Sequence, residues 1–259
     1  LLAPLERMGK RSISGLVQLG KEANQTELKI VGSSSSADID LQFYPFGDDW
    51  RYSGFVSVDE FNLGQLLNQD NLGVTTFALD IDGQGFKFEA LKTKLHGTFD
   101  SFAFNSYNYQ NIDVNGFFDR GLFNGNLSVD DPSLQLDFEG SFDTFGETKN
   151  ISCFAQVGHA NLYDIGLPFL NQRTIFSGDI ELVSQGKNAD DFIGDLFIES
   201  GKLTNDDESF TFSRFTVQSR LNDGVRFVNL RSQDVLDGLL YGKFGFSQIP
   251  SMFKNALGS

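Results

Sequence analysis

Several residue types are scarce in this chain of 259 residues, which holds 1 Cys, 2 His, 1 Trp and 5 Pro. A single cysteine excludes an intramolecular disulfide framework. The two histidines, His96 and His159, have no neighbours at metal-ligand spacing, which argues against a zinc centre. No apolar run approaches the ~20 residues of a membrane-spanning helix, and no signal peptide is visible. The few prolines indicate long segments without breaks.

Basic residues are also few, because 20 Lys and Arg stand against 35 Asp and Glu, a formal charge of −15. This balance argues against nucleic-acid binding, since phosphate recognition needs clustered Lys and Arg. The acids mostly alternate with apolar residues, as in Asp38-Ile39-Asp40-Leu41. We therefore interpret the acidity as the solvated face of a sheet, and not as an acidic interaction tail.

Two residue types are abundant instead, with 28 Phe and 27 Gly. Many of the glycines stand in one pattern, in which alternate positions read apolar, Gly, apolar, apolar. The pattern occurs at residues 13–19, 52–58, 123–129, 176–182, 192–198 and 240–246. Chance predicts roughly two copies in a chain of this composition. Since alternate residues of a strand share a face, each glycine is expected on an apolar face, as clearance for a guest or as a bend.

A period of two dominates the chain from Ser12 onward and predicts roughly sixteen to eighteen strands. The expected strands are 15–19, 27–31, 38–44, 50–58, 75–81, 86–91, 94–104, 107–114, 122–129, 133–142, 151–157, 174–183, 192–199, 208–220, 225–231 and 239–247. Short helices are expected at 59–67 and 250–257, and residues 1–11 are expected to be irregular or helical. So many strands suggest a barrel, a sandwich or a long curled sheet. The uneven spacing of the glycine pattern disfavours a strict solenoid.

Four stretches are more specific than composition: residues 50–73, 102–116, 123–140 and, more weakly, 230–238. The first holds Trp50, Gly54 and Gly64, and the third runs through Asp130-Asp131-Pro132. In this order they resemble the TamB family of translocation and assembly module proteins, in the form found in Bacteroidota. That family belongs with the AsmA-like, bridge-like lipid-transfer group. The resemblance covers most of residues 12–250 and rests on the alternation pattern and on these few short sequence motifs.

The resemblance implies a periplasmic protein, anchored to the inner membrane, with a β-taco fold whose hydrophobic groove carries phospholipid toward the outer membrane. A role in outer-membrane biogenesis, with an outer-membrane assembly barrel protein as partner, is also implied. This chain would then be an internal segment, since the anchor and the barrel-contacting region are not in its sequence. We expect phospholipid acyl chains as its own partner, no nucleic acid and no cofactor.

We therefore expect an all-β fold, a long curled, mostly antiparallel sheet that forms an open half-pipe with an apolar lumen and few short helices. Residues 1–259 would form one elongated β-groove segment, with 250–259 as a short helix or tail. The expected lipid-lining residues alternate along the glycine-containing strands. They are Tyr52, Gly54, Val56, Val58, Phe123, Gly125, Leu127, Val129, Phe176, Gly178, Ile180, Leu182, Phe192, Gly194, Leu196, Ile198, Phe244 and Phe246. If Gly125 provides clearance for an acyl chain, Gly125→Phe should block lipid passage and leave the fold largely intact.

Two other classes stay open from the residues alone, a β-sandwich adhesion or glycan-binding module and part of an outer-membrane barrel. Chemistry is not indicated. Asp130, Asp131 and Asp137 lack the spacing of an EF-hand and are expected to cap turns. Cys153 shares a strand face with apolar residues and has no flanking base, which predicts a small buried hydrophobe and not a nucleophile. We expect no enzymatic activity and no metal site.

Overall fold

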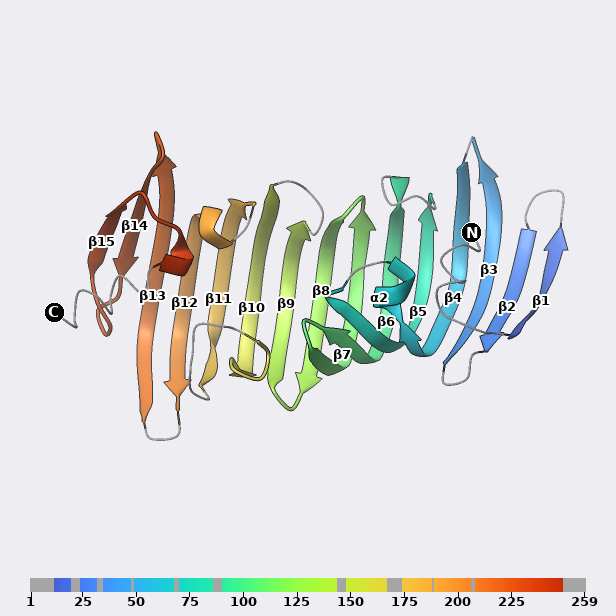
Figure 1. Ribbon diagram of the computed structural model, residues 1–259, viewed down its shortest axis with the longest axis horizontal. Coiled ribbons are helices and arrows are strands. Elements are labelled where there is room, and N and C mark those ends of the chain that lie inside the picture. The colour runs from blue at the N-terminus through green and yellow to red at the C-terminus, as the bar shows by residue number, and fades with distance from the viewer. Residues whose placement is uncertain are drawn as a thin grey trace. The chain divides into compact units, whose positions relative to one another are not determined.

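A computed structural model describes residues 12–19, 24–31, 35–47, 49–67, 70–85, 90–143, 148–166, 174–187, 189–205 and 208–248. The described chain is all-β. Its 15 strands follow one another through a sheet in chain order, from β1 to β15 (Figure 1). Every strand pair with a resolved register is antiparallel. The expected all-β, antiparallel fold with few helices is confirmed.

Contacts divide the chain into two compact units, and each is described by itself. Unit 1 comprises Leu1–Gly121 and Gly125–Pro132, and unit 2 comprises Leu122–Asn124 and Ser133–Ser259. Unit 1 holds β1 (Ser12–Leu19), β2 (Asn24–Val31), β3 (Ser36–Phe46), β4 (Asp49–Asn62), β5 (Leu72–Gln84), β6 (Lys92–Phe104), β7 (Tyr107–Asp119) and most of β8 (Leu122–Asp131).

Unit 2 holds β9 (Leu134–Asp143), β10 (Lys149–Asn161), β11 (Ile175–Gly186), β12 (Ile193–Thr204), β13 (Ser209–Asn222), β14 (Val225–Arg231) and β15 (Gly238–Gly242). Short helices are few in the described residues. They are α2 (Leu63–Leu67) in unit 1, and the 3-10 turns η2 (Ala189–Asp191) and η3 (Phe246–Gln248) in unit 2. The prediction of one elongated segment over 1–259 stays a prediction, and its terminal parts, 1–11 and 250–259, lie outside the described residues.

The strand register follows from the alternation of apolar and polar residues. In unit 1, Gly54 of β4 lies opposite Leu41 of β3 and Ile81 of β5. The neighbouring row joins Ile39, Val56 and Leu79. Because alternate residues of a strand share a face, each such row extends one apolar face and leaves the acids on the other. A slip of one residue would reverse the two faces, so the hydrophobic pattern fixes the register.

The helix expected at 59–67 is only partly correct, because β4 continues to Asn62. A bulge between Val58 and Phe61, with Glu60 at φ 48°, adds residues to the strand and returns Phe61 to the apolar face. Asn62 then caps α2, since its Oδ1 accepts a hydrogen bond from the backbone N–H of Gln65 at 2.8 Å. The bulge lets the strand continue beyond the point where apolar and polar residues stop alternating regularly.

The strand expected at 239–247 is wrong in its second half. β15 ends at Gly242, and Phe246 lies in η3. The chain leaves the sheet after Gly242, and Phe244 and Phe246 then contact Arg226 and Phe192, which are far away in sequence. The strand expected at 86–91 lies mostly outside the described residues, and Ala90 belongs to a 3-10 turn.

Candidate apolar binding surface

The candidate site in each unit is the apolar face of the sheet. In unit 1 this face is formed mainly by Ile39, Leu41, Tyr52, Val56, Val58, Phe77, Leu79, Ile81, Leu95, Phe99, Ile112, Val114, Leu127 and Val129. The single tryptophan, Trp50, shares the face with Tyr52 and is 37% exposed at its margin. The face is therefore apolar across several neighbouring strands, with a natural fluorescent reporter at one end.

In unit 2 the apolar face is formed mainly by Leu136, Phe138, Cys153, Ala155, Val157, Phe176, Ile180, Leu182, Leu196, Ile198, Phe215, Val217, Val228 and Leu240. Cys153 lies in its middle, opposite Gly140 of β9 and Leu182 of β11. The thiol is half-buried, and this burial raises its pKa, while a backbone hydrogen bond with Leu182 acts in the opposite direction. Cys153 was expected to be a small buried hydrophobe, and it is only half-buried on the apolar face, so its thiol can report on that face.

The side chains of the apolar faces range from buried to half-buried. Phe61, Leu79 and Phe176 expose 5–8% of their surface, whereas Val56 and Leu196 are half-buried. The largest side chains that expose less than 2% of their surface are Val228, Thr75 and Ser219. No Phe, Leu or Ile among the described residues is buried to that degree, although the chain holds 28 Phe. Two packed layers would bury many large side chains completely. The described sheet therefore buries part of each apolar face and leaves other side chains of the face half-buried.

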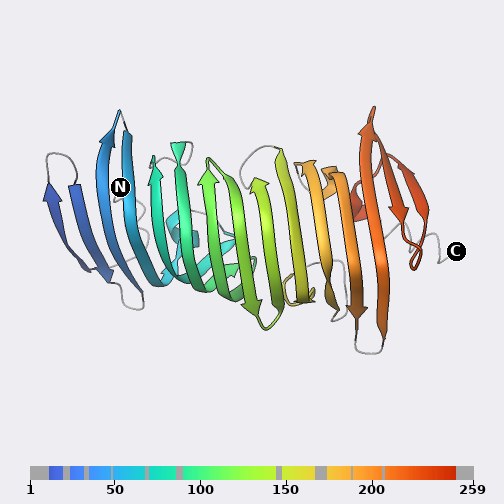
Figure 2. The ribbon, with the colours of Figure 1, turned by 180° about the vertical axis from the view of Figure 1, so that it is seen from behind.

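Short segments cover parts of the face in each unit. In unit 1, Leu63 of α2 packs against a cluster of Ala37, Val58 and Phe61. Figure 1 shows α2 in front of the strands, and Figure 2 shows it behind them. In unit 2, Leu162 and Ile165 pack against Val157, Ala160 and Phe176. These covers shield one part of each face.

Polar contacts hold the cover of unit 2 in place. Asp164 accepts hydrogen bonds at Oδ2 from Asn161 Nδ2 at 2.6 Å and from Ser133 Oγ at 3.1 Å. The backbone N–H of Asn161 also donates to Ser133 O at 2.8 Å. Ser133 and Asn161 are both nearly buried, so these bonds satisfy groups that water does not reach.

At three glycines of the repeated pattern, Gly54, Gly125 and Gly194, the neighbouring strand leaves no room for a side chain, whereas a Cβ at Gly242 would make only ordinary contact, 3.5 Å from Phe244. A Cβ at Gly54 would lie 2.1 Å from the carbonyl oxygen of Asp40, and a Cβ at Gly194 would lie 2.1 Å from that of Val183. Both residues also have φ values that L side chains rarely adopt, +144° at Gly54 and +157° at Gly194. The sequence left two roles open, clearance for an acyl chain or a bend. At Gly54 and Gly194 the structure shows instead a close approach of the neighbouring strand's backbone.

The expectation that Gly125→Phe leaves the fold largely intact is therefore wrong. A Cβ at Gly125 would lie 2.4 Å from both the carbonyl oxygen of Asn115 and the Cα of Gly116. These are backbone atoms of the neighbouring strand and cannot move without displacing it. The substitution is expected to disrupt the sheet, so it cannot serve as a selective block of lipid passage.

Most of the expected lining residues do share the apolar face of their unit. Four of them are half-buried on this face, Val56 and Leu127 in unit 1 and Ile180 and Leu196 in unit 2. Most of the other expected lining residues lie on the same face of their unit. Phe123 is 5% exposed and contacts Phe142, with ring centroids 5.1 Å apart. The exceptions are Phe192, which precedes β12, and Phe244 and Phe246, which follow β15.

The sequence did not predict which polar residues occupy the apolar face. Asp131 is 2% exposed, and it accepts hydrogen bonds from the Tyr107 hydroxyl at 2.5 Å and the Gln110 backbone N–H at 2.9 Å. Tyr109 packs edge-on against Tyr107, with centroids 4.7 Å apart. Burial, and secondarily the charge of Asp131, raises the pKa of Tyr109. These groups fix the end of β7 against β8, as structural contacts do.

Among the described residues, no group of three or more His, Cys, Asp or Glu side chains could hold a metal ion. His96 is exposed on the polar face of β6, and His159 is half-buried beside the bulge in β10. Across the part of the chain that the structure describes, no helix has the length and apolar character to span a membrane.

Comparisons of the chain with protein-family models, with curated proteins and with solved structures give no match. The surface itself is therefore the basis for a functional proposal.

Proposed function

We propose that this chain is a segment of a lipid-transfer conduit, in which the apolar faces contact phospholipid acyl chains. The observation that carries the proposal is an apolar face that spans neighbouring strands in each unit and on which side chains such as Val56 and Leu196 stay half-buried. An ordinary domain would cover such a face with a second layer. An acyl chain supplies the missing apolar contacts and asks for no specific hydrogen bonds.

The energetics favour such a ligand. Burying one methylene group is worth ~0.8 kcal/mol, so a complete acyl chain is stabilised by about 10 kcal/mol before the entropy cost of ordering it. Half-buried side chains such as Val56 and Leu182 gain burial at the same time. The polar face, with Asp40, Asp80 and Glu139 exposed, keeps the other side in water. The proposal therefore needs only the alternation that the sequence provides.

The resemblance to the TamB family supports the wider setting of this proposal. In that setting the segment belongs to a β-taco-like half-pipe in the periplasm, anchored to the inner membrane by another part of its chain. It would carry phospholipid between the inner and outer membranes and serve outer-membrane biogenesis, with an assembly barrel protein as partner. The segment performs no covalent chemistry in this proposal.

The test uses Trp50, which lies at the margin of the apolar face of unit 1. Brominated stearic acid added below its critical micelle concentration should quench Trp50 fluorescence with saturation. Val56→Asn, on the apolar face, should weaken the quenching, because it places an amide where the chain would lie. Phe55→Asn, on the polar face next to it, is the matched control and should leave the quenching unchanged. Equal effects of the two variants, or no saturable quenching, would refute the proposal.

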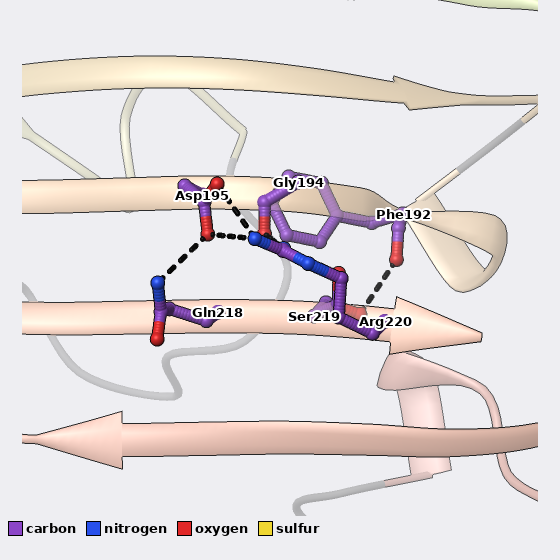
Figure 3. A network of polar contacts seen from close by, with 6 residues as sticks. All are labelled: Phe192, Gly194, Asp195, Gln218, Ser219 and Arg220. Carbon is purple, nitrogen blue, oxygen red and sulfur yellow. Dashed lines mark hydrogen bonds and ion pairs between the residues drawn. The ribbon is translucent and has the colours of Figure 1, made fainter. Parts of the chain in front are cut away.

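A glycan-binding module is the second candidate, favoured by one observation on the polar face of unit 2. Tyr241 is 72% exposed and stacks with Phe227, with an interplanar angle of 16°. Beside this pair, Arg220 Nη2 donates to both carboxylate oxygens of Asp195, at 2.8 and 2.9 Å, and Gln218 donates to Asp195 at 3.2 Å (Figure 3). Flat rings beside fixed polar groups suit the C–H faces and hydroxyls of a sugar.

A glycan array separates this candidate from the lipid proposal. Binding that is lost in Tyr241→Ala and kept in Tyr163→Ala, another exposed tyrosine of unit 2, would favour the glycan-binding module. Absence of binding to any glycan would remove it.

A further inference from the structure

After β15 the chain turns back over the apolar face of unit 2. We call residues 243–248 the strap. Its Gly245 lies so close to η2 that a Cβ there would be 2.6 Å from Asp190 Cγ. Since η2 precedes β12, the strap reaches from the last strand past the ends of β14 and β13. Figure 1 shows its red 3-10 turn in front of these strands, and Figure 2 shows it behind them.

Arg226 of β14 joins the strap to η2. Its side chain lies on the apolar face, since Arg226 alternates with Val228, and it is 3% exposed. The guanidinium donates from Nε to Phe244 O at 3.2 Å, from Nη2 to Asp190 O at 2.5 Å, and from Nη1 to Phe192 O. A charge-assisted donor that binds three backbone carbonyls at once fixes both segments in one arrangement.

Aromatic contacts complete the closure. The rings of Phe192 and Phe246 meet edge-on, with centroids 5.4 Å apart. The Arg226 guanidinium also lies over the Phe246 ring, 4.9 Å from its centroid. Both phenylalanines were expected to line a lumen from within strands, and instead they lie against each other at one end of the face.

The strands next to the strap carry small residues here, Ser219 and Gly194. Ser219 of β13 is fully buried, and its hydroxyl donates to Phe192 O at 2.8 Å and accepts from Arg226 Nη1 at 3.0 Å. Gly194 of β12 lies directly opposite Ser219 (Figure 3). Two positions earlier in β13, Val217 lies on the same face and is only half-buried. Solvent access to the apolar face therefore differs between two successive positions of β13 on that face, Val217 and Ser219.

We infer that the strap, held by Arg226, is a wall that closes one margin of the apolar face of unit 2 and confines an apolar chain to the middle of the strands. This inference rests on the proposed lipid-binding function. It adds which part of the face is available: Val217 and the middle of β10 and β11 lie inside, and Ser219 lies behind the wall. Arg226 is then a positioning residue that acts through the strap.

The experiment compares two engineered thiols in a Cys153→Ser background, Ser219→Cys behind the wall and Val217→Cys in front of it. Alkylation by N-ethylmaleimide is followed by mass spectrometry, with and without oleate. Cys at 217 should react readily, and oleate should slow it. Cys at 219 should react at least about tenfold more slowly, with no effect of oleate, because the wall must open locally before the thiol is reached. Equal reactivity at the two positions without oleate would overturn the wall.

Strap variants supply the second arm. Arg226→Met removes the hydrogen bonds to the strap, and Phe246→Ala removes the aromatic contact without altering the sheet. Either variant should raise the reactivity at position 219 and make it sensitive to oleate, with hydrogen exchange across β10 and β11 unchanged. If neither variant does so, the wall is overturned. If oleate fails to protect position 217 in the parent, the lipid proposal itself fails, whatever happens at 219.

Discussion

Replacing Gly194 by alanine tests why glycine recurs on the apolar face. The ideal Cβ would lie 2.1 Å from Val183 O and 2.7 Å from Ser184 Cα, both in the backbone of β11. Normal contact requires more than about 1 Å of additional separation, which β11 provides only by breaking its pairing locally. The φ of +157° adds strain, since alanine rarely adopts it.

The expected loss of stability follows from these two terms. Strain of this kind costs about 1–3 kcal/mol. Losing one or two ladder hydrogen bonds costs about 0.5–1.5 kcal/mol each. We therefore expect Gly194→Ala to lower the free energy of unfolding of unit 2 by about 2–5 kcal/mol.

Urea unfolding followed by circular dichroism, with hydrogen exchange in β11 and β12, measures this change. Gly158→Ala is the matched control, because a Cβ there would meet only Gln135, at 3.5 Å, and the backbone is unstrained. The control should change stability by less than about 0.5 kcal/mol. A Gly194→Ala protein as stable as the control, with weakened lipid binding, would show that the glycine provides clearance and that the backbone argument is wrong.

Three further outcomes are expected. Thr75→Val should destabilise unit 1 by about 1–3 kcal/mol in urea unfolding, because it leaves the Ser101 carbonyl without the 2.8 Å bond from Thr75 Oγ1, whereas Thr75→Ser, which keeps the hydroxyl and loses only a buried methyl group, should cost less. The alkylation rate of Cys153 should rise with pH at higher pH values than the rate of an exposed thiol does, since burial raises the pKa of Cys153. A pH profile equal to that of an exposed thiol would contradict the assigned environment. The hydrogen bonds from the Ser213 hydroxyl and backbone N–H lower the pKa of Asp234. The stabilisation from these two hydrogen bonds should therefore be complete above the ordinary carboxyl pKa and be lost as the pH falls through the lowered pKa of Asp234. An NMR titration in which Ser213→Ala leaves the Asp234 pKa unchanged would refute that cause.

The strand content could be predicted from the sequence because a period of two is a local signal. Strand ends could not, because they depend on distant contacts. Residues 240–246 alternate like any strand, but the chain leaves the sheet after Gly242 and its Phe244 carbonyl binds Arg226, eighteen residues earlier. β4 outlasts its alternation for a related reason, a bulge at Glu60 that no pattern announces.

The lining residues could be predicted as a set, but the reason for the glycines between them could not. Alternation places Val56 and Leu196 on an apolar face whatever the partner strand does. Whether Gly54 or Gly125 makes room for a ligand or for a neighbouring backbone depends on strand-to-strand approach, which sequence does not encode locally. The carbonyl 2.1 Å from the position of a Gly54 Cβ answers that question.

The central claim is that the apolar face receives acyl chains, and the native thiol of Cys153 tests it most directly. Its alkylation rate is measured in detergent-free buffer at rising oleate concentration, beside a Cys153→Ser, Ser152→Cys protein that moves the thiol to the exposed polar face of the same strand. We expect saturable protection of Cys153, by about tenfold or more, and none at position 152. Unchanged reactivity of Cys153, or equal protection at both positions, would contradict it.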